Sequence, residues 1–408
     1  MASGLLQGLK ILDLTHIWAG PLAIRFLADM GADVIKVEAP LSRGPQEYPS
    51  TPIGGWLGGE PSDEPWNRNA MVAKLMRNRR SLAIDLKTDQ GREVFLKLVA
   101  QADVVVENFS ARAMHNLRLG YPVLKQANPQ IVYIQMPGFG ITGPLCDRVA
   151  FGPTVEVMSG FTQMMGYGPD HLMNTGMALL DPITATNAAS AILQGLRQRD
   201  QSNKSVHIEM SLHEGGVSYN GPWLVQQQLT PDSLECIGNR HPQMVPHGVF
   251  ACLGEDQWVA IACANDGQWV RLCTVIPGLD ANLDQAARRA QEDEIEAVIR
   301  AWCKDQHKLD VVHALQNGGV AAGSVNNVAE MVADEQTQSR GFFVEYEPSD
   351  TPMPGNPMHM SQMQPDTWKP YAKLGEHNQE VLSEWLGMDG ESVQKLHQAG
   401  VIVDKPPA

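Results

Sequence analysis

A strand, a helix and a second strand follow one another over residues 9–38 and constrain the fold more than any other stretch. Residues 9–14 (LKILDL) and 32–38 (ADVIKVE) are apolar runs of strand length, and Gly20-Pro21 opens a helical segment between them. Two strands joined by a helix lie parallel in one sheet, because a hairpin connection is much shorter. We therefore predict an α/β fold with a parallel sheet.

The whole chain is 408 residues long and has room for two domains. We predict strands at 81–86, 102–109, 131–135, 205–210, 249–252 and 257–262, helices at 88–99, 182–197, 266–273, 291–303, 308–316 and within 374–401, a glycine-rich turn at 318–323, and a proline-rich arm at 348–370. We expect a large domain over 1–204, a connector over 205–235, a small domain over 236–335, and a C-terminal arm with helices over 336–408.

Charge, cysteines and hydropathy disfavour several classes of protein. The net charge of −15 argues against nucleic acid as a partner. The six cysteines are scattered without paired motifs, so we expect neither a metal site nor disulfides, and a cytoplasmic location. No apolar run approaches the ~20 residues of a membrane helix, and we expect no signal peptide and no membrane partner. The turn at 15–21 lacks the G-x-G-x-x-G of NAD-binding folds.

A lone acid, Asp181, stands where an apolar run enters a helix of small residues. Asp is a preferred N-cap and Pro182 suits the first helical position, so Asp181 can be a plain cap. The same geometry suits a nucleophile, since N–H groups and the positive end of the helix dipole hold a carboxylate ionised and accessible. The local sequence leaves both roles open.

Polar residues also gather at the ends of other predicted strands. Asn108 and Phe109 close one of them, at the edge where open α/β sheets bind ligands. Arg79 and Arg80 stand just ahead of another strand, where they either face solvent or anchor phosphates. Arg112 lies on the helix that follows Asn108.

A series of different short motifs is spread along almost the whole chain. They lie at 9–38, 78–81, 85–87, 108–109, 138–144, 238–242, 265–269, 340–343 and 374–378, and include Asn78-Arg-Arg-Ser81, Gly238-Asn-Arg-His-Pro242 and Leu374-Gly-Glu-His-Asn378. In this order they resemble the class III coenzyme A transferases (CaiB/BaiF), the family of formyl-CoA and carnitine CoA-transferases with its racemase relatives.

The resemblance implies both a fold and a reaction. The fold is a Rossmann-like large domain with a smaller α/β domain, in a homodimer of interlocked, ring-like chains. The reaction moves coenzyme A from an acyl-CoA thioester to a carboxylic acid, with Asp181 as nucleophile. By this resemblance its carboxylate attacks the donor to give a mixed anhydride, the CoA thiolate returns to give an aspartyl-CoA thioester, and the acceptor acid completes the exchange. Such covalent catalysis needs neither a metal nor a prosthetic group.

The resemblance also points to residues that contact coenzyme A. They are His16, Ile17, Trp18, Arg79, Arg80, Asn108 and Phe109. A basic residue of the family's CoA site falls near Asn116, and either Arg112 or Arg118 is a candidate replacement. Gly238 and Asn239 match a mobile loop over the active site, although Gly238 can also serve only to turn the chain.

The chain departs from the family at Phe151-Gly152, where formyl-CoA transferase has Tyr-Glu and the racemases have His-Asp. The missing acid/base groups disfavour an α-methylacyl-CoA racemase or other acyl-CoA isomerase, which stays the alternative enzyme. A CoA-ester binding protein without turnover is the second alternative, with Asp181 only a cap. Glu156, close by, either contacts substrate or has a structural role. The acyl groups themselves are not predicted.

Overall fold

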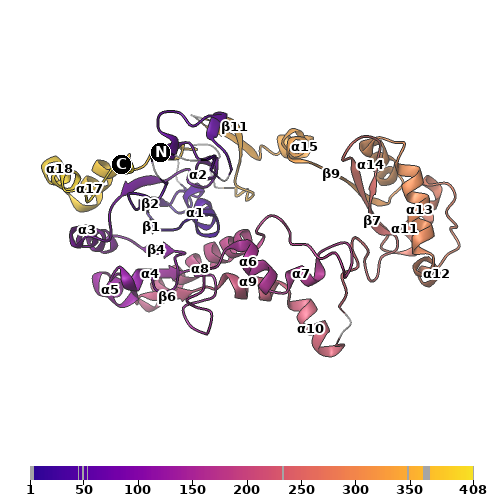
Figure 1. Cartoon of the computed structure of the whole chain (residues 1–408), viewed down its shortest axis with the longest axis horizontal. Coiled ribbons are helices and arrows are strands. Elements are labelled where there is room, and N and C mark those ends of the chain that lie inside the picture. Colours follow the sequence, from indigo (N-terminus) through magenta and orange to yellow (C-terminus); the bar gives the residue numbers. More distant parts are fainter. Residues whose placement is uncertain are drawn as a thin grey trace. The chain divides into compact units, whose positions relative to one another are not determined.

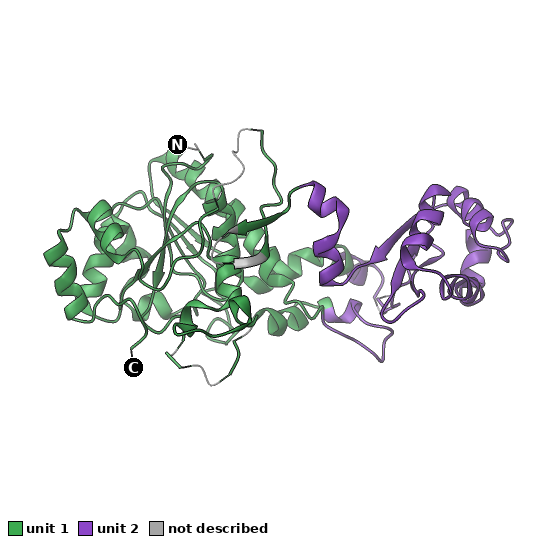
Figure 2. Cartoon of the chain, turned by 90° about the horizontal axis from the view of Figure 1, so that it is seen from above, with its two compact units in different colours: residues 1–161, 175–224, 341–408 green, residues 162–174, 225–340 purple. Residues whose placement is uncertain are grey.

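The chain divides into two compact units in the computed structural model (Figure 2). One comprises residues 1–161, 175–224 and 341–408, and the other comprises residues 162–174 and 225–340. The structure describes residues 4–44, 46–47, 50–52, 54–231, 234–346, 349–361 and 368–407.

A six-stranded parallel sheet forms the centre of the first unit (Figure 1). Its strands are β1 (Lys10–Asp13), β2 (Asp33–Glu38), β3 (Arg80–Ala83), β4 (Val104–Glu107), β5 (Val132–Gln135) and β6 (Val206–Glu209). They lie in the order β3-β2-β1-β4-β5-β6, so the predicted parallel sheet is confirmed. The strand order reverses between β1 and β4, and in such sheets ligands bind at the carboxyl ends of the two strands that flank this point.

Helices cover both faces of this sheet, and each face has its own hydrophobic core. The helices are α1 (Ala19–Asp29), α2 (Ala70–Leu75), α3 (Asp89–Val99), α4 (Ala113–Asn116), α5 (Tyr121–Ala127), α6 (Gly152–Met158), α8 (Leu180–Ser202), α9 (Leu212–Tyr219), α17 (Asn378–Leu386) and α18 (Gly390–Gln398), with short 3-10 turns η1 (Leu57–Gly59) and η2 (Pro65–Asn67). Side chains alternate along a strand, so Ile11 packs with α1, α6 and α8 while Leu12 packs with α3, α17 and α18 on the opposite face. The sheet is therefore buried on both sides.

The second unit has a smaller antiparallel sheet and its own core. Its strands β7 (His247–Ala251), β8 (Trp258–Ala262) and β9 (Ala321–Val325) lie in the order β7-β8-β9. Its helices are α11 (Asp266–Val275), α12 (Gln285–Ala290), α13 (Glu292–Cys303), α14 (Lys308–Asn317), α15 (Val328–Ala333) and α16 (Glu335–Ser339). Trp269, Leu272 and Ile299 are fully buried in this core. Two further helices, α7 (Phe161–Met164) and α10 (Gly221–Leu229), include residues of both units.

Two sequence predictions need correction. The sequence predicts a glycine-rich turn at 318–323, but residues 321–323 begin β9, which pairs with β8. The predicted arm at 348–370 begins with a hairpin, in which β10 (Phe343–Tyr346) pairs with β11 (Ser349–Pro354). Residues 348 and 362–367 of that arm lie outside the described residues. Among the described helices, none is both long and apolar enough to span a bilayer.

The C-terminal segment returns to the first unit through Asn378, a buried residue at the start of α17. Its Oδ1 accepts the Ala83 N–H at 2.9 Å, and its Nδ2 donates to the Val403 carbonyl at 2.8 Å. The Asn378 amide thus joins β3 to the chain near the C-terminus.

We expect Asn378→Ala to lower the free energy of unfolding by about 2 kcal/mol, because it leaves the buried Ala83 N–H without a partner. Urea unfolding followed by circular dichroism measures this change. The adjacent exposed residue gives the control, and Gln379→Ala should shift the free energy by less than about 0.5 kcal/mol. Equal stability of the two variants would contradict the bridging role of Asn378.

Candidate active site

Asp181 is the second residue of α8, so it does not occupy the N-cap position, which was one of the two roles that the sequence leaves open. The helix begins at Leu180, and Leu179 occupies the N-cap position without a side-chain hydrogen bond. Pro182 is consequently the third helical residue, where its missing N–H is still harmless. The Asp181 side chain points instead to α1, where its Oδ1 accepts the N–H of Ala19 at 3.3 Å. One carboxylate therefore lies at the positive ends of two helices.

The environment of Asp181 differs from the predicted accessible one. The residue is only 9% exposed. Burial raises the pKa of its carboxyl group to about 6, and the hydrogen bond from Ala19 opposes this rise in pKa only in part. A carboxyl group with a pKa of about 6 is still mostly ionised at pH 7. Asp181 is thus a buried carboxylate with a raised pKa and with no cationic partner among the described residues.

The turn after β1 and the end of β4 form one local structure, as predicted for residues at this edge of the sheet. Asn108 accepts the His16 N–H at 2.7 Å and donates to the His16 carbonyl at 2.8 Å. The His16 ring stacks on Phe109 with 5.3 Å between ring centroids. Ile17 has a φ of 66° and is exposed, and Trp18 leads directly into α1. The structure therefore brings these five predicted residues together beside the first residue of α1, which contacts Asp181.

A buried carboxylate that the sequence reasoning did not single out supports this turn. Glu107, the last residue of β4, accepts the Phe109 N–H at 2.6 Å and also hydrogen bonds from Tyr133 and Gln135. Burial raises the pKa of Glu107 to about 7, although all three donors favour its ionised form. The only sequence signal was an acid at the end of an otherwise apolar strand. Burial also lowers the pKa of His16, to about 4, so this ring is neutral at pH 7.

Arg79 does not lie where a residue that binds phosphate is expected. Its guanidinium is buried and bonds to Asp13 at 2.6 Å and to the Leu75 carbonyl at 2.8 Å. Asp13 also accepts two hydrogen bonds from Thr15, whose carbonyl bonds to Lys36. The structure therefore uses Arg79 to neutralise a buried acid beneath the turn that follows β1.

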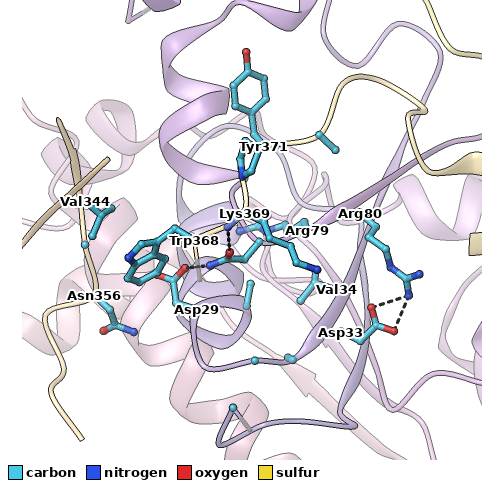
Figure 3. A pocket seen from close by; sticks show the side chains of 18 of the residues that line it. Asp29, Asp33, Val34, Arg79, Arg80, Val344, Asn356, Trp368, Lys369 and Tyr371 are labelled. Carbon is cyan, nitrogen blue, oxygen red and sulfur yellow. Dashed lines mark hydrogen bonds and ion pairs between the residues drawn. The ribbon is translucent and has the colours of Figure 1, made fainter. Parts of the chain in front are cut away.

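Arg80 faces the opposite edge of the sheet, at the amino ends of β2 and β3. There it lines a cavity of about 640 Å³ with Asp33, Trp368 and Tyr371 (Figure 3). Arg80 makes paired hydrogen bonds with Asp33 at 2.7 and 2.8 Å, and it also bonds to Glu380 and Glu384. Three carboxylates already neutralise this guanidinium. Because Arg80 is the first residue of β3, it also lies at the other end of the sheet from the turn at His16.

A smaller hollow at the carboxyl edge of the sheet is lined by cations that form fewer ion pairs than Arg80 does. It has a volume of about 360 Å³ and is lined by Lys87, Asp89, Arg92, Asn116, Leu117 and Arg118. Its two sides follow the carboxyl ends of β3 and β4. Within the described chain, neither Lys87 nor Arg118 forms an ion pair, whereas Arg92 bonds to Asp89. Arg112, outside this hollow, is exposed and forms paired hydrogen bonds with Asp147.

Gly238 and Asn239 belong to the second unit. Gly238 has a φ of 64°, a conformation that favours glycine, and the Asn239 carbonyl bonds to His247 at 2.6 Å. The backbone conformation of Gly238 therefore suits a residue that turns the chain. In the part of the chain that the structure describes, no three His, Cys, Asp or Glu side chains gather where they can hold a metal ion.

Comparison with known proteins places this site in context. Residues 6–378 match the sequence family described as CoA-transferase family III. The succinate–glutarate CoA-transferase of Agrobacterium fabrum is 34% identical over 93% of this chain and 95% of its own length. The acetyl-CoA:oxalate CoA-transferase of Acetobacter aceti is 31% identical over 95% of this chain and 97% of its own. The crystal structure of a CAIB/BAIF family protein from Brucella suis superposes with a TM-score of 0.83 and 30% identity, covering 94% of this chain and all of that one.

The buried position of Arg79 predicts a structural defect on its removal. We expect Arg79→Met to lower the free energy of unfolding by about 3–5 kcal/mol, because Asp13 loses its closest cationic partner. Chemical denaturation of the ligand-free protein measures this change. Arg112→Met, which removes an exposed ion pair, should leave the unfolding midpoint nearly unchanged. A stable Arg79→Met protein with weakened binding of CoA esters would restore the phosphate role.

Proposed function

The chain belongs to CoA-transferase family III and is an acyl-CoA:carboxylate CoA-transferase, and we propose that Asp181 is its nucleophile. One observation carries this proposal: the buried carboxylate of Asp181 lies at the start of two helices, beside the turn of residues 16–18. Because no described cation pairs with it, no ion pair masks its lone pairs. A raised pKa also makes a carboxylate a better nucleophile than an ordinary exposed one.

The transfer proceeds in four balanced steps. The Asp181 carboxylate attacks the thioester carbonyl of the donor, the C–S bond breaks, and a mixed anhydride forms with release of the CoA thiolate. The thiolate attacks Cγ of Asp181, which releases the donor acid and leaves an aspartyl-CoA thioester. The acceptor carboxylate then attacks Cγ and expels the thiolate. Attack of the thiolate on the acceptor's acyl carbon gives the new acyl-CoA and regenerates Asp181.

The Ala19 N–H has a defined part in the middle steps. When a nucleophile attacks Cγ of Asp181, negative charge develops on the oxygens of that same side chain. Oδ1 already accepts the Ala19 N–H at 3.3 Å, so this donor is in place for the developing oxyanion. In other acyl transfers such a donor contributes about 3 kcal/mol to the stability of the transition state.

Coenzyme A is proposed to bind along the carboxyl edge of the sheet. The turn of His16, Ile17 and Trp18 with Asn108 and Phe109 offers an apolar surface and backbone groups for the pantetheine arm and adenine. Since Arg79 and Arg80 are neutralised by acids, we assign the phosphates to Lys87 and Arg118 in the cationic hollow.

We propose a short dicarboxylate as acceptor. The relatives from Agrobacterium fabrum and Acetobacter aceti are named for succinate, glutarate and oxalate, and a relative from Chloroflexus aurantiacus for L-malate. All of these acids carry two carboxylates, one of which can attack Cγ of Asp181 while the other is held by the enzyme.

The active enzyme is proposed to be a homodimer. None of the nine residues of α10 is buried in the single chain, and Trp223, Val225 and Leu229 of this helix expose apolar side chains. A helix without buried residues has little to stabilise it in water. A second copy of the chain, interlocked with the first, is proposed to cover it.

Incubation with an acyl-CoA donor should leave a coenzyme A thioester on Asp181, detectable by intact mass and peptide mapping after borohydride reduction. The donor panel comprises the CoA esters of oxalate, succinate and glutarate, with acetyl-CoA as the monocarboxylic comparison. Asp181→Asn should form no adduct and keep the same fold. An active enzyme whose adduct is absent, or lies on another residue, would refute the assignment.

The rate of adduct formation should depend on pH through Asp181. Only the ionised carboxylate attacks, and burial raises its pKa to about 6. At low acyl-CoA concentration the rate should therefore be constant above about pH 7 and fall about tenfold per unit below about pH 5. Stopped-flow or quenched-flow sampling across this range measures the profile, and a profile flat to pH 4 would contradict it.

Arg118→Ala should raise the KM for acyl-CoA about tenfold with little change in kcat, because it removes a charge-assisted contact to phosphate. With the corresponding 3′-dephospho-CoA ester this KM difference should disappear if Arg118 binds the 3′-phosphate. Arg112→Ala is the matched comparison, since Arg112 lies on the same segment but pairs with Asp147. A larger effect of Arg112→Ala than of Arg118→Ala would transfer the role to Arg112.

A further inference from the structure

One face of α6 is directed at the segment that leads into Asp181. Gly152 and Glu156 are four residues apart on this helix and therefore lie on the same side of it. Both are buried, whereas Thr154 between them is exposed. The two residues contact the segment 175–181 in different ways.

Glu156 ties down the residues just before α8. Its side chain is 1% exposed. Oε1 accepts the Thr175 N–H at 2.6 Å, and Oε2 accepts the Thr175 hydroxyl at 2.8 Å and the Leu179 N–H at 3.2 Å. The described residues supply these three neutral donors and no cation. One buried carboxylate thus fixes both ends of the five-residue segment that precedes Leu180.

Gly152 allows a close approach between α6 and the same segment. A Cβ atom at position 152 would lie 2.0 Å from Oδ2 of Asp181 and 2.6 Å from Cβ of Ala178. Both distances are far below van der Waals contact, so any side chain here displaces the Asp181 carboxylate. Oδ2 is also the oxygen of Asp181 that accepts no hydrogen bond from the described residues, since Ala19 bonds to Oδ1.

The segment needs such support because its own conformation is unfavourable. Ala178 has a φ of 47°, a left-handed conformation that non-glycine residues rarely adopt. Leu179, at the N-cap position, offers no side-chain oxygen to the first turn of α8. The helix α6 is itself held to α9 by Asn220, whose amide donates to the Ser159 carbonyl at 2.9 Å.

We propose that Gly152 and Glu156 are positioning residues for Asp181. Glu156 holds the strained segment before α8, and Gly152 keeps the space beside Oδ2 free, so that Oδ2 is the oxygen that attacks the thioester. This inference rests on the proposed role of Asp181 as nucleophile. It assigns one common function to Glu156 and to Gly152, a position at which the chain differs from the relatives in its family.

Two variants test the pair. Glu156→Gln keeps the shape of the side chain but turns an NH₂ group toward at least one of the three donors, and Gly152→Ala places a methyl group at Oδ2. Each should lower the rate of Asp181 adduct formation at saturating acyl-CoA by about 10- to 100-fold, as expected for a misplacement of about 1 Å. The KM for acyl-CoA should change less than about twofold, because the proposed CoA contacts lie on other elements.

Thr154→Ala is the control on the exposed side of α6 and should label Asp181 at the rate of the unsubstituted enzyme. All rates are taken at a temperature at which thermal unfolding curves show each variant fully folded. A purely structural role would lower the unfolding midpoint without lowering this rate.

The outcomes separate this inference from the proposed function. If the unsubstituted enzyme labels Asp181 and both variants do so at the same rate, the positioning role is wrong and the nucleophile stands. If catalytic turnover occurs without any adduct on Asp181, the proposed mechanism is wrong, and the positioning role is wrong with it. A slow rate in both variants with an unchanged KM supports the inference.

Discussion

The packing of α1 against α8 is the contact on which the candidate site depends. The two helices make the most extensive contact between any two elements of the described chain, and both contribute small buried residues to the same core, among them Ala23, Ala185 and Ala188. Small side chains let the helix axes approach closely. The start of α1 and the start of α8 then meet, which places the Ala19 N–H at the carboxylate of Asp181. Asp181, the proposed nucleophile, and the turn after β1 are thereby parts of one contiguous arrangement.

Buried charge beneath the turn after β1 keeps this arrangement in place. Asp13 is fully buried, and the cations of Lys36 and Arg79 hold its pKa below the usual range against the effect of burial. Through its hydrogen bonds to Thr15, the same carboxylate fixes the backbone that leads to His16. Such a network adds little net stability, but removal of one member leaves an uncompensated charge. Its value here is geometric, because it specifies a single conformation of the turn.

Local signals in the sequence predicted much of the fold and part of the site. Apolar strand runs and helix start signals located the parallel sheet and helices such as α3, whose N-cap is Thr88, the first residue of the predicted helix. Asn108 was located by its place at the end of a strand. For Arg79 the sequence offers only solvent or a phosphate as partner, because Asp13 is 66 residues away and only the folded sheet brings the two together. The start of α8 differs from the predicted one for the same reason, since the acceptor for the N–H of Leu179, its N-cap residue, is Glu156 on another helix.

Gly152 also bears on the choice between transfer and isomerisation. At the position of residues 151–152 the resemblance to the family leads one to expect Tyr-Glu or His-Asp, yet a Cβ at residue 152 would overlap with Oδ2 of Asp181. An acidic side chain and the observed position of Asp181 therefore exclude each other. Removal and return of an α-proton need a second acid/base group at the substrate, and this position does not provide one. The proposed transfer of coenzyme A through an anhydride needs one carboxylate with free lone pairs, and the space left by Gly152 meets that need.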